Sequence, residues 1–247
     1  MFKTIRNAFK VKELRGKILY TFMMLVVIRF GSQLPIPGIE STFFKDWFAK
    51  QTTDVFGFFN AMTGDSFSNM SIFALSITPY ITSSIIIQLL TIAIPKLEEL
   101  QKDGEEGRKK IQEYTRYTTV ALALLESSAM AIGFGRQGLL QDYNAWNVII
   151  AIATMTTGSS LLMWIGEQIT DKGVGNGISI VLLFNILSSI PDDIKSLYYR
   201  FIFGQSIPVM AGAAILIALV IVLMVVFAVV LNNAERRIPV QYSKKMV

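Results

Sequence analysis

The side chains that carry most enzyme chemistry are missing from this chain of 247 residues. It has no histidine and no cysteine, which removes the commonest general base, the usual zinc ligands and any thiolate nucleophile. This composition argues against a conventional hydrolase or metalloenzyme, and we expect no catalytic residue, metal ion or other cofactor. The stretch DKGVGNGIS at 171–179 has the glycines of a phosphate-binding loop. No strand is expected before it and no Gly-Lys-Ser/Thr follows, so a tight turn between two helices is the better interpretation.

Two other groups of residues have types and spacing that suggest a function. Glu126 lies in the apolar stretch ALALLESSAM. A carboxylate inside a membrane costs several kcal/mol unless it is neutral, paired or hydrated, so Glu126 is a functional candidate, with a packing hydrogen bond as the alternative. Ile81 and Ile85 are four residues apart and share one face of a helix. Such a face usually contacts core or lipid, but a ring of such residues can form a constriction that excludes water.

The elements that position these residues are predicted to lie in a membrane. The chain is 52% hydrophobic and 17% charged, with a mean hydropathy of +0.49, whereas soluble domains are about one quarter charged. Residues 72–95 carry no charge and are long enough to cross a bilayer, which takes about 20 residues. Pro79 and several hydroxyl side chains interrupt this run, which indicates contact with other helices or with a water-filled cavity.

The hydropathy pattern predicts six spans. They lie at about 18–36, 72–95, 117–135, 146–166, 177–194 and 208–231. The fifth is the weakest, because its apolar part is short and ends before Pro191. With the N-terminus in the cytoplasm, 17 Lys and Arg residues fall in cytoplasmic segments and 5 in external ones. This asymmetry predicts that both ends of the chain are cytoplasmic, and it explains the net charge of +5 without nucleic-acid binding.

The long external connection at 37–71 contains a second unusual feature. The stretch from Val55 to Met62 is aromatic and apolar but too short to span a membrane. It is predicted to be a short helix that buries itself against the protein or the membrane interface. One interpretation is an interfacial amphipathic helix, and the other is a segment folded into the mouth of a channel.

Five stretches of this chain, spread in order over nearly its whole length, resemble the SecY family, the central subunit of the bacterial protein-conducting channel. They are FGSQLPIPGIE (30–40), SIFALSITPYITSSIIIQLL (71–90), IPKLEELQKDGEEGRKKIQEYTRY (94–117), WIGEQITDKGVGNGISI (164–180) and ERRIPVQYSKK (235–245). The resemblance implies an all-α, polytopic transmembrane helix bundle. Such a chain holds half of a ten-helix clamshell plus the sixth span, with a short external plug helix.

The resemblance also implies how the chain is divided. Residues 1–200 are expected to form the N-terminal half, with five spans and a plug at about 55–69. Residues 201–247 are expected to hold the sixth span and the start of the cytoplasmic loop between spans six and seven, where the C-terminal half begins. The missing remainder of that half indicates a fragment.

The family assigns roles to particular residues. The implied pore ring consists of Ile81, Ile85, Leu182 and Ile186, the last two placed by counting from GNGIS. The implied plug residues are Val55, Phe56, Phe58, Phe59 and Met62. The lateral gate is expected at Ser84, Gln88 and Glu126, and the surface that docks cytoplasmic partners at Arg236, Arg237, Lys244 and Lys245.

The implied function is that of the pore-forming subunit of the Sec translocon in the bacterial plasma membrane. Unfolded polypeptides would cross through it, and hydrophobic segments would leave sideways into lipid. The implied partners are SecE and SecG, the SecA motor ATPase, the ribosome, polypeptides with signal sequences, and membrane lipids. The alternative is a secondary transporter of small solutes, for which broken spans and the intramembrane Glu126 would be suitable.

Overall fold

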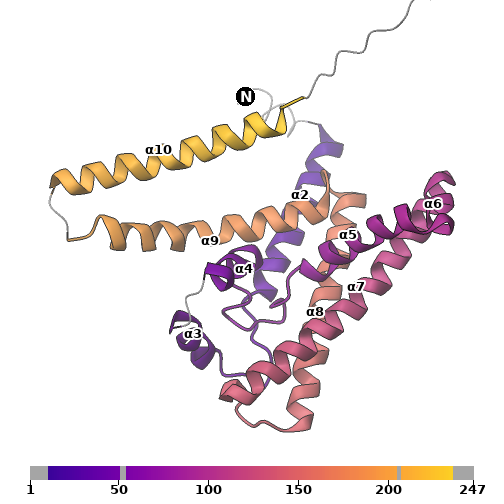
Figure 1. Ribbon diagram of the computed structural model, residues 1–247, viewed down its shortest axis with the longest axis horizontal. Coiled ribbons are helices and arrows are strands. Elements are labelled where there is room, and N and C mark those ends of the chain that lie inside the picture. Colours follow the sequence, from indigo (N-terminus) through magenta and orange to yellow (C-terminus); the bar gives the residue numbers. More distant parts are fainter. Residues whose placement is uncertain (1–10, 51–53, 205–206, 236–247) are drawn as a thin grey trace, which may run out of the picture. The chain divides into compact units, whose positions relative to one another are not determined.

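The computed structural model describes residues 11–50, 54–204 and 207–235. This part of the chain is helical, and its only extended pairings are two isolated bridges, Pro35 with Ser71 and Ile39 with Leu140. The helices of Figure 1 are α2 (Lys12–Gly31), α3 (Ser41–Lys50), α4 (Asp54–Thr63), α5 (Thr78–Ala93), α6 (Pro95–Lys102), α7 (Gly104–Phe134), the π-helical turn η1 (Gly135–Leu139), α8 (Ala145–Lys172), α9 (Gly177–Phe201) and α10 (Ile207–Asn232). The predicted all-α class is confirmed.

The chain forms two compact units, Met1–Ile190 and Pro191–Val247. The first unit holds α2 to α8 and most of α9. The second holds the end of α9 and α10, a helix without a charged residue. The resemblance implied a different division, at residue 200, between the N-terminal half and the sixth span. That division stays a prediction.

Four helical segments in the described residues are long and apolar enough to cross a membrane. They are Gly104–Gly138, Ala145–Lys172, Gly177–Phe201 and Pro208–Asn232. A fifth is possible if α5 and α6, which meet at an angle of 103°, count as one broken span. α2 carries too many charged residues to count among these segments, because every stretch of 18 residues within it contains Arg15, Lys17 and Arg29. The first predicted span therefore remains a prediction.

The fifth predicted span, the weakest in the sequence, lies within a long helix. α9 has 25 residues and continues through Pro191 to Phe201, so the proline does not end it as expected. Proline lacks an N–H, so the ladder of backbone hydrogen bonds loses one donor at this point. The boundary between the two units falls at the same place.

The prediction for residues 72–95 was wrong about where the helix begins. The segment from Ser71 to Ile77 forms turns, and α5 starts only at Thr78. Met70 and Ser76 have positive φ angles of 44° and 53°, which a helix cannot contain. Pro79 therefore lies in the first turn of α5, where its fixed φ favours the helix and its missing N–H costs nothing.

Two apolar clusters hold the first unit together. One cluster joins α3 and the segment after α4 to α7 and α8, and includes the buried Phe44, Phe67 and Met155. The other joins α2, α8 and α9 through the turn segment, and includes Phe73, Leu162 and Val181. The turn segment is thus part of the protein core.

One close approach of backbones depends on a glycine in α8. A Cβ atom at Gly158 would lie 1.9 Å from the carbonyl oxygen of Ile72, so only glycine lets α8 come this near to the turn segment. Close to this point, Ser159 Oγ donates a hydrogen bond of 3.2 Å to the carbonyl of Ser76. α8 therefore fixes the segment from which α5 emerges.

Candidate functional site

A cavity of about 330 Å³ lies among α5, α7, α8 and the start of α9. Its walls combine aliphatic side chains with polar and acidic ones. They are Tyr80, Ile81, Ser84, Ile85, Gln112, Glu167, Thr170, Asp171, Asn176 and Ile178. The cavity thus brings together the two isoleucines that the sequence singled out and the turn that it placed before the fifth span.

The four predicted ring residues differ in their surroundings. Ile81 is half-buried and packs against the cluster that contains Val181, whereas Ile85 is 52% exposed. Leu182 is half-buried and Ile186 is 41% exposed. Ile178, Leu182 and Ile186 are spaced four apart, so they share a face of α9, and Ile178 lines the same cavity as Ile85. This geometry is compatible with a ring, which stays a prediction.

An ion pair in the cavity wall was missed by the sequence analysis. Arg116 Nε of α7 lies 2.8 Å from Glu167 Oε1 of α8, and Gln112 Nε2 donates to the same oxygen at 3.2 Å. The fourth span was predicted to end at residue 166, but α8 continues to Lys172 and buries Glu167. The available signal was that Gln112 and Arg116 are four residues apart, and so lie on one helix face.

The predicted plug is a helix only in its first part. The plug was expected as one short helix over about 55–69, but α4 ends at Thr63 and turns follow to Ser71. Gly64 and Asp65 both have positive φ angles, 61° and 65°, which end the helix. Asn60 closes the turn, because its Nδ2 donates to Asp65 Oδ1 at 2.8 Å and its Oδ1 accepts the Ser68 N–H at 3.0 Å.

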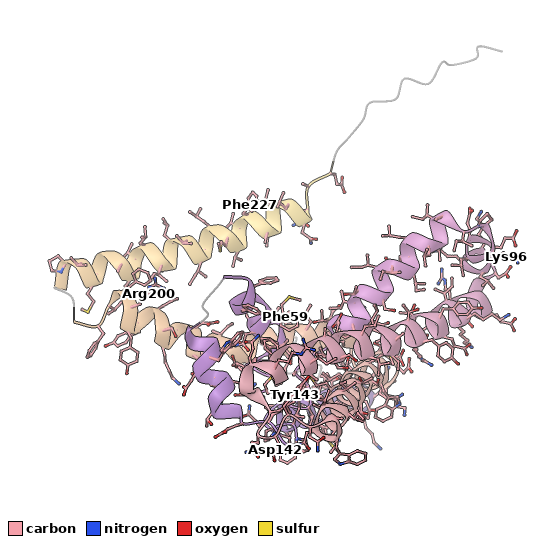
Figure 2. The ribbon with its side chains drawn as sticks, turned by 60° about the horizontal axis from the view of Figure 1, so that its bottom comes forward. Phe59, Lys96, Asp142, Tyr143, Arg200 and Phe227 are labelled. Atoms are coloured by element: carbon pink, nitrogen blue, oxygen red, sulfur yellow. The ribbon has the colours of Figure 1, made fainter. Side chains whose placement is uncertain are left out.

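The aromatic side chains of α4 pack against the protein on one side only. Phe59, labelled in Figure 2, meets the buried Phe67 edge to face with ring centroids 5.0 Å apart. Phe56 also packs against this cluster, and Met62 is half-buried. Phe58, in contrast, is 68% exposed. The helix therefore buries itself against the protein, as the sequence predicted. The side chain of Val55, the remaining plug candidate, is outside the described part of the structure.

Glu126 lies in the wall of a second cavity, of about 380 Å³, beside α4. The other lining residues are apolar: Phe56, Phe59, Phe67, Leu75, Ala129, Met130 and Phe134. Among the described residues the Glu126 carboxylate makes no hydrogen bond, so the packing hydrogen bond considered as its alternative role is not seen there.

The three predicted gate residues do not meet in one place. Ser84 lines the first cavity, among α5, α7, α8 and α9. Glu126 lines the second cavity, beside α4, and Gln88 is exposed on α5. Gln88 Nε2 approaches Ser84 Oγ at 3.5 Å. A better example of polar contact between spans is Ser83, whose Oγ donates to the carbonyl of Thr115 on α7 at 2.9 Å.

The four predicted docking residues lie outside the part of the chain that the structure describes. Arg236, Arg237, Lys244 and Lys245 all follow residue 235, the last that the structure describes. Their assignment stays a prediction from the resemblance.

Comparison with known proteins decides the family. The SecY family model matches residues 71–246 of this chain. The chain belongs to the SecY family. Among SecY relatives, the protein translocase subunit SecY of Corynebacterium glutamicum is 42% identical over 254 residues, which cover 98% of this chain and 56% of that protein. The SecY of Halalkalibacterium halodurans is 40% identical over 252 residues, which cover 100% of this chain and 58% of that protein. The chain thus spans somewhat more than half the length of these curated SecY relatives.

Solved structures show the same fold. A structure described as a protein-conducting channel matches with a TM-score of 0.61 and 19% identity, over 87% of this chain and 47% of the other. Sec61 in the canine ribosome–channel complex matches with a TM-score of 0.62 and 19% identity, over 91% of this chain and 49% of the other. At this identity the likeness concerns the fold, so the helices of this SecY chain follow a channel architecture.

Proposed function

We propose that this SecY chain forms the N-terminal half and sixth span of the pore subunit of a protein-conducting channel. The observation that carries the proposal is a pair of cavities in the first unit. Ile81 and Ile85 line one of them, and the other lies between α4 and α7. A helix too short to span, packed through Phe59 against the protein, is suited to closing a channel reversibly, because apolar contacts alone hold its rings.

Transport through such a pore requires no covalent chemistry. A ring of aliphatic side chains grips a passing polypeptide without specific hydrogen bonds, so many sequences can slide through it. The same ring limits the flow of ions and water, because an apolar neck loses its water readily. Energy for transport would come from a partner. The match to SecY supports this channel over the small-solute transporter considered from the sequence.

The lateral gate is proposed at the edge formed by α5 and α7. Ser84 and Gln88 lie on α5 and Glu126 on α7, and Ser83 joins the two helices through its bond to Thr115. Opening between two helical half-bundles would expose the pore to lipid, and apolar segments of the transported chain would partition sideways. Glu126 would be the polar member of this edge closest to the plug.

The proposed partners are those that the resemblance implied. They are supported by the relatives, which are named as protein translocase subunits, and by the fold match to a ribosome–channel complex. They are SecE, SecG, SecA, the ribosome, polypeptides with signal sequences, and membrane lipids. The proposed location is the bacterial plasma membrane, with both ends of this chain cytoplasmic. Docking is assigned to Arg236, Arg237, Lys244 and Lys245, whose replacement by Glu should weaken ribosome or SecA binding most at low salt. Co-sedimentation at two salt concentrations measures this.

Crosslinking to a transported chain tests the proposed pore. A photoreactive benzophenone side chain replaces Ile85 in the full-length protein, and a polypeptide is stalled during transport. Crosslinks from this position are expected, because its side chain faces a cavity and is half exposed. The matched control replaces Leu90, which lies about 140° around the same helix and lines neither cavity. Equal crosslinking from both positions, or none from position 85, contradicts the assignment.

A further inference from the structure

Arg29, in the last turn of α2, bonds inward to two other elements. Its Nη1 donates to the carbonyl oxygen of Gly64 at 3.1 Å and to Ser188 Oγ of α9 at 3.1 Å. Long cationic side chains near the end of a membrane span commonly reach out to the membrane surface, whereas Arg29 bonds to groups inside the protein. One guanidinium nitrogen instead connects α2, the end of the proposed plug helix and α9.

The contact between the plug and α9 is close. A Cβ atom at Gly64 would lie 2.8 Å from Ser188 Oγ and 3.0 Å from the backbone of Asn185, so glycine is needed for this approach as well as for the φ of 61°. Ser188 Oγ also donates to the carbonyl of Asn185 at 2.8 Å, which leaves its lone pairs for Arg29. The hydroxyl is thereby oriented as an acceptor.

The same bonds continue to the start of α5. Asn185 Nδ2 donates to Ser76 Oγ at 3.0 Å, and Ser76 is the residue with positive φ two positions before α5. The end of the plug and the base of α5 therefore share one surface of α9. A shift of α9 relative to α5 would disturb the bonds at both places.

The charge of Arg29 is held by neutral acceptors. Within the described part of the chain it forms no ion pair, and both of its partners are uncharged oxygens. Hydrogen bonds from a charged donor are stronger than neutral ones. They can still be exchanged for water without separating two opposite charges. The hydrogen bonds of Arg29 are therefore suited to an interaction that is repeatedly broken and re-formed.

We infer that Arg29 is a positioning residue for the plug, which it holds closed by bridging Gly64 to Ser188. The inference rests on the proposed function, in which α4 is the plug and α9 carries Leu182 and Ile186 of the pore. Ser188 follows Ile186 by two residues on α9. A polypeptide that pushes α9 away from α5 withdraws the Ser188 acceptor, and the hold of Arg29 on the plug weakens. Widening of the pore and release of the plug are then one event.

The test measures resting ion conductance of the full-length channel in planar bilayers. Arg29→Gln should raise the open fraction about tenfold, the change expected for loss of a charge-assisted hydrogen bond. Arg29→Lys should raise the resting conductance less than Arg29→Gln, because lysine keeps the positive charge but lacks the planar guanidinium group. The matched control is Arg15→Gln, which removes an exposed charge from the same helix and should leave conductance unchanged.

Deletion of residues 57–66 separates the two hypotheses. If the deletion leaves resting conductance unchanged, the plug assignment itself fails. If it raises conductance while Arg29→Gln behaves like Arg15→Gln, the plug stands and the role of Arg29 is overturned. In the deleted background Arg29→Gln should add nothing, because Gly64 is gone; a further rise shows that Arg29 does not act through the plug.

If Arg29→Gln does not assemble, a second variant still tests the inference. Ser188→Ala removes one acceptor and keeps the charge and the Gly64 bond, so assembly by size-exclusion chromatography should be normal. Its resting conductance should rise, by less than that of Arg29→Gln. Wild-type conductance in Ser188→Ala overturns the inference.

Discussion

Ile81 and Ile85 share one face of α5, yet only one of them also supports the core. Ile81 packs against the cluster around Val181, whereas Ile85 is exposed to the cavity. If Ile85 lines the proposed pore, its replacement by Ser should raise resting ion conductance several-fold without loss of stability, since a polar side chain favours water in an apolar constriction. Ile81→Ser should raise conductance and also lower the unfolding temperature, because buried apolar contacts are lost.

Single-channel recording in planar bilayers measures the leak, and thermal unfolding in detergent measures stability. Leu89→Ser is the control, because Leu89 is exposed on the same helix and lines neither cavity. A leak from Leu89→Ser as large as that from Ile85→Ser would remove the special role of the cavity.

The ion pair of Arg116 and Glu167 should respond unequally to loss of its two members. Arg116→Met leaves a carboxylate that is 9% exposed and that, among the described residues, keeps only the Gln112 amide as a side-chain donor, at a cost of about 3 kcal/mol. Glu167→Gln leaves a half-exposed guanidinium that water can reach, and should cost about 1 kcal/mol.

Chemical denaturation of the purified protein in detergent gives both values. The double variant should be destabilised by less than their sum, because residues in contact do not contribute independently. Equal losses for the two single variants would show that burial of Glu167 does not decide the energetics.

Residue by residue, the sequence predicted contacts that depend on local spacing and missed those that depend on the fold. Ile81 and Ile85 were found because four residues make about one helical turn. The partners of Arg29 are 35 and 159 residues away, and Glu167 lies 51 residues from Arg116. No local pattern encodes such distances, although a charged residue near an apolar span is a reason to look for a partner.

At the scale of elements, the approach of α8 to the turn segment depends on one missing methyl group. Gly158→Ala would place a carbon 1.9 Å from the Ile72 carbonyl oxygen, so the two backbones must move apart. A loss of about 1–3 kcal/mol is expected, as for other overpacked sites. Gly133→Ala in α7 is the matched control, because a Cβ there meets nothing within 4 Å.

The control should be neutral or stabilising by up to about 1 kcal/mol, since alanine favours a helix more than glycine. Unfolding temperatures of the two variants are compared with that of the unaltered protein. If Gly158→Ala unfolds at the same temperature as Gly133→Ala, the contact with Ile72 is not tight in solution.

Hydropathy identified most of the helices but not all of their ends. The apolar stretches in α7, α8, α9 and α10 were predicted because a long apolar run with almost no charge is typical of a membrane span. Residues 72–77 are just as apolar, but they form buried turns, and burial in protein and burial in lipid select the same side chains. The short helix predicted from the apolar stretch at 55–62 agrees with α4 to within one residue at each end. The plug bounds of about 55–69, which the resemblance implied, extend past Gly64 and Asp65, whose positive φ angles end the helix.

For the whole molecule, the orientation in the membrane is the broadest prediction. Asp103 lies exposed in the turn between α6 and α7, and Asp142, labelled in Figure 2, lies exposed before α8. The 17-to-5 distribution of basic residues predicts that the first lies in the cytoplasm and the second outside. Asp103→Cys and Asp142→Cys should therefore react with a membrane-impermeant maleimide from opposite sides.

This chain has no cysteine, so each variant reports one position once any cysteine elsewhere in the full-length protein is removed. Intact cells and inverted membrane vesicles are labelled in parallel. Labelling of both positions from the same side would mean that α7 does not cross the membrane, and labelling with the two sides exchanged would reverse the orientation.

The hydrogen bonds that fix the turn segment before α5 can form only after later parts of the chain have been synthesised. Ser76 is held by Ser159 and Asn185, which are made 83 and 109 residues later. At about 5–20 residues per second, the second of these partners leaves the ribosome roughly 5–20 s after Ser76. During that delay the segment has its apolar side chains but not its final contacts, and lipid is the environment that can receive them. Slowing translation between residues 76 and 185 should lengthen the life of this intermediate, and the segment would then be open to proteases and chaperones for longer.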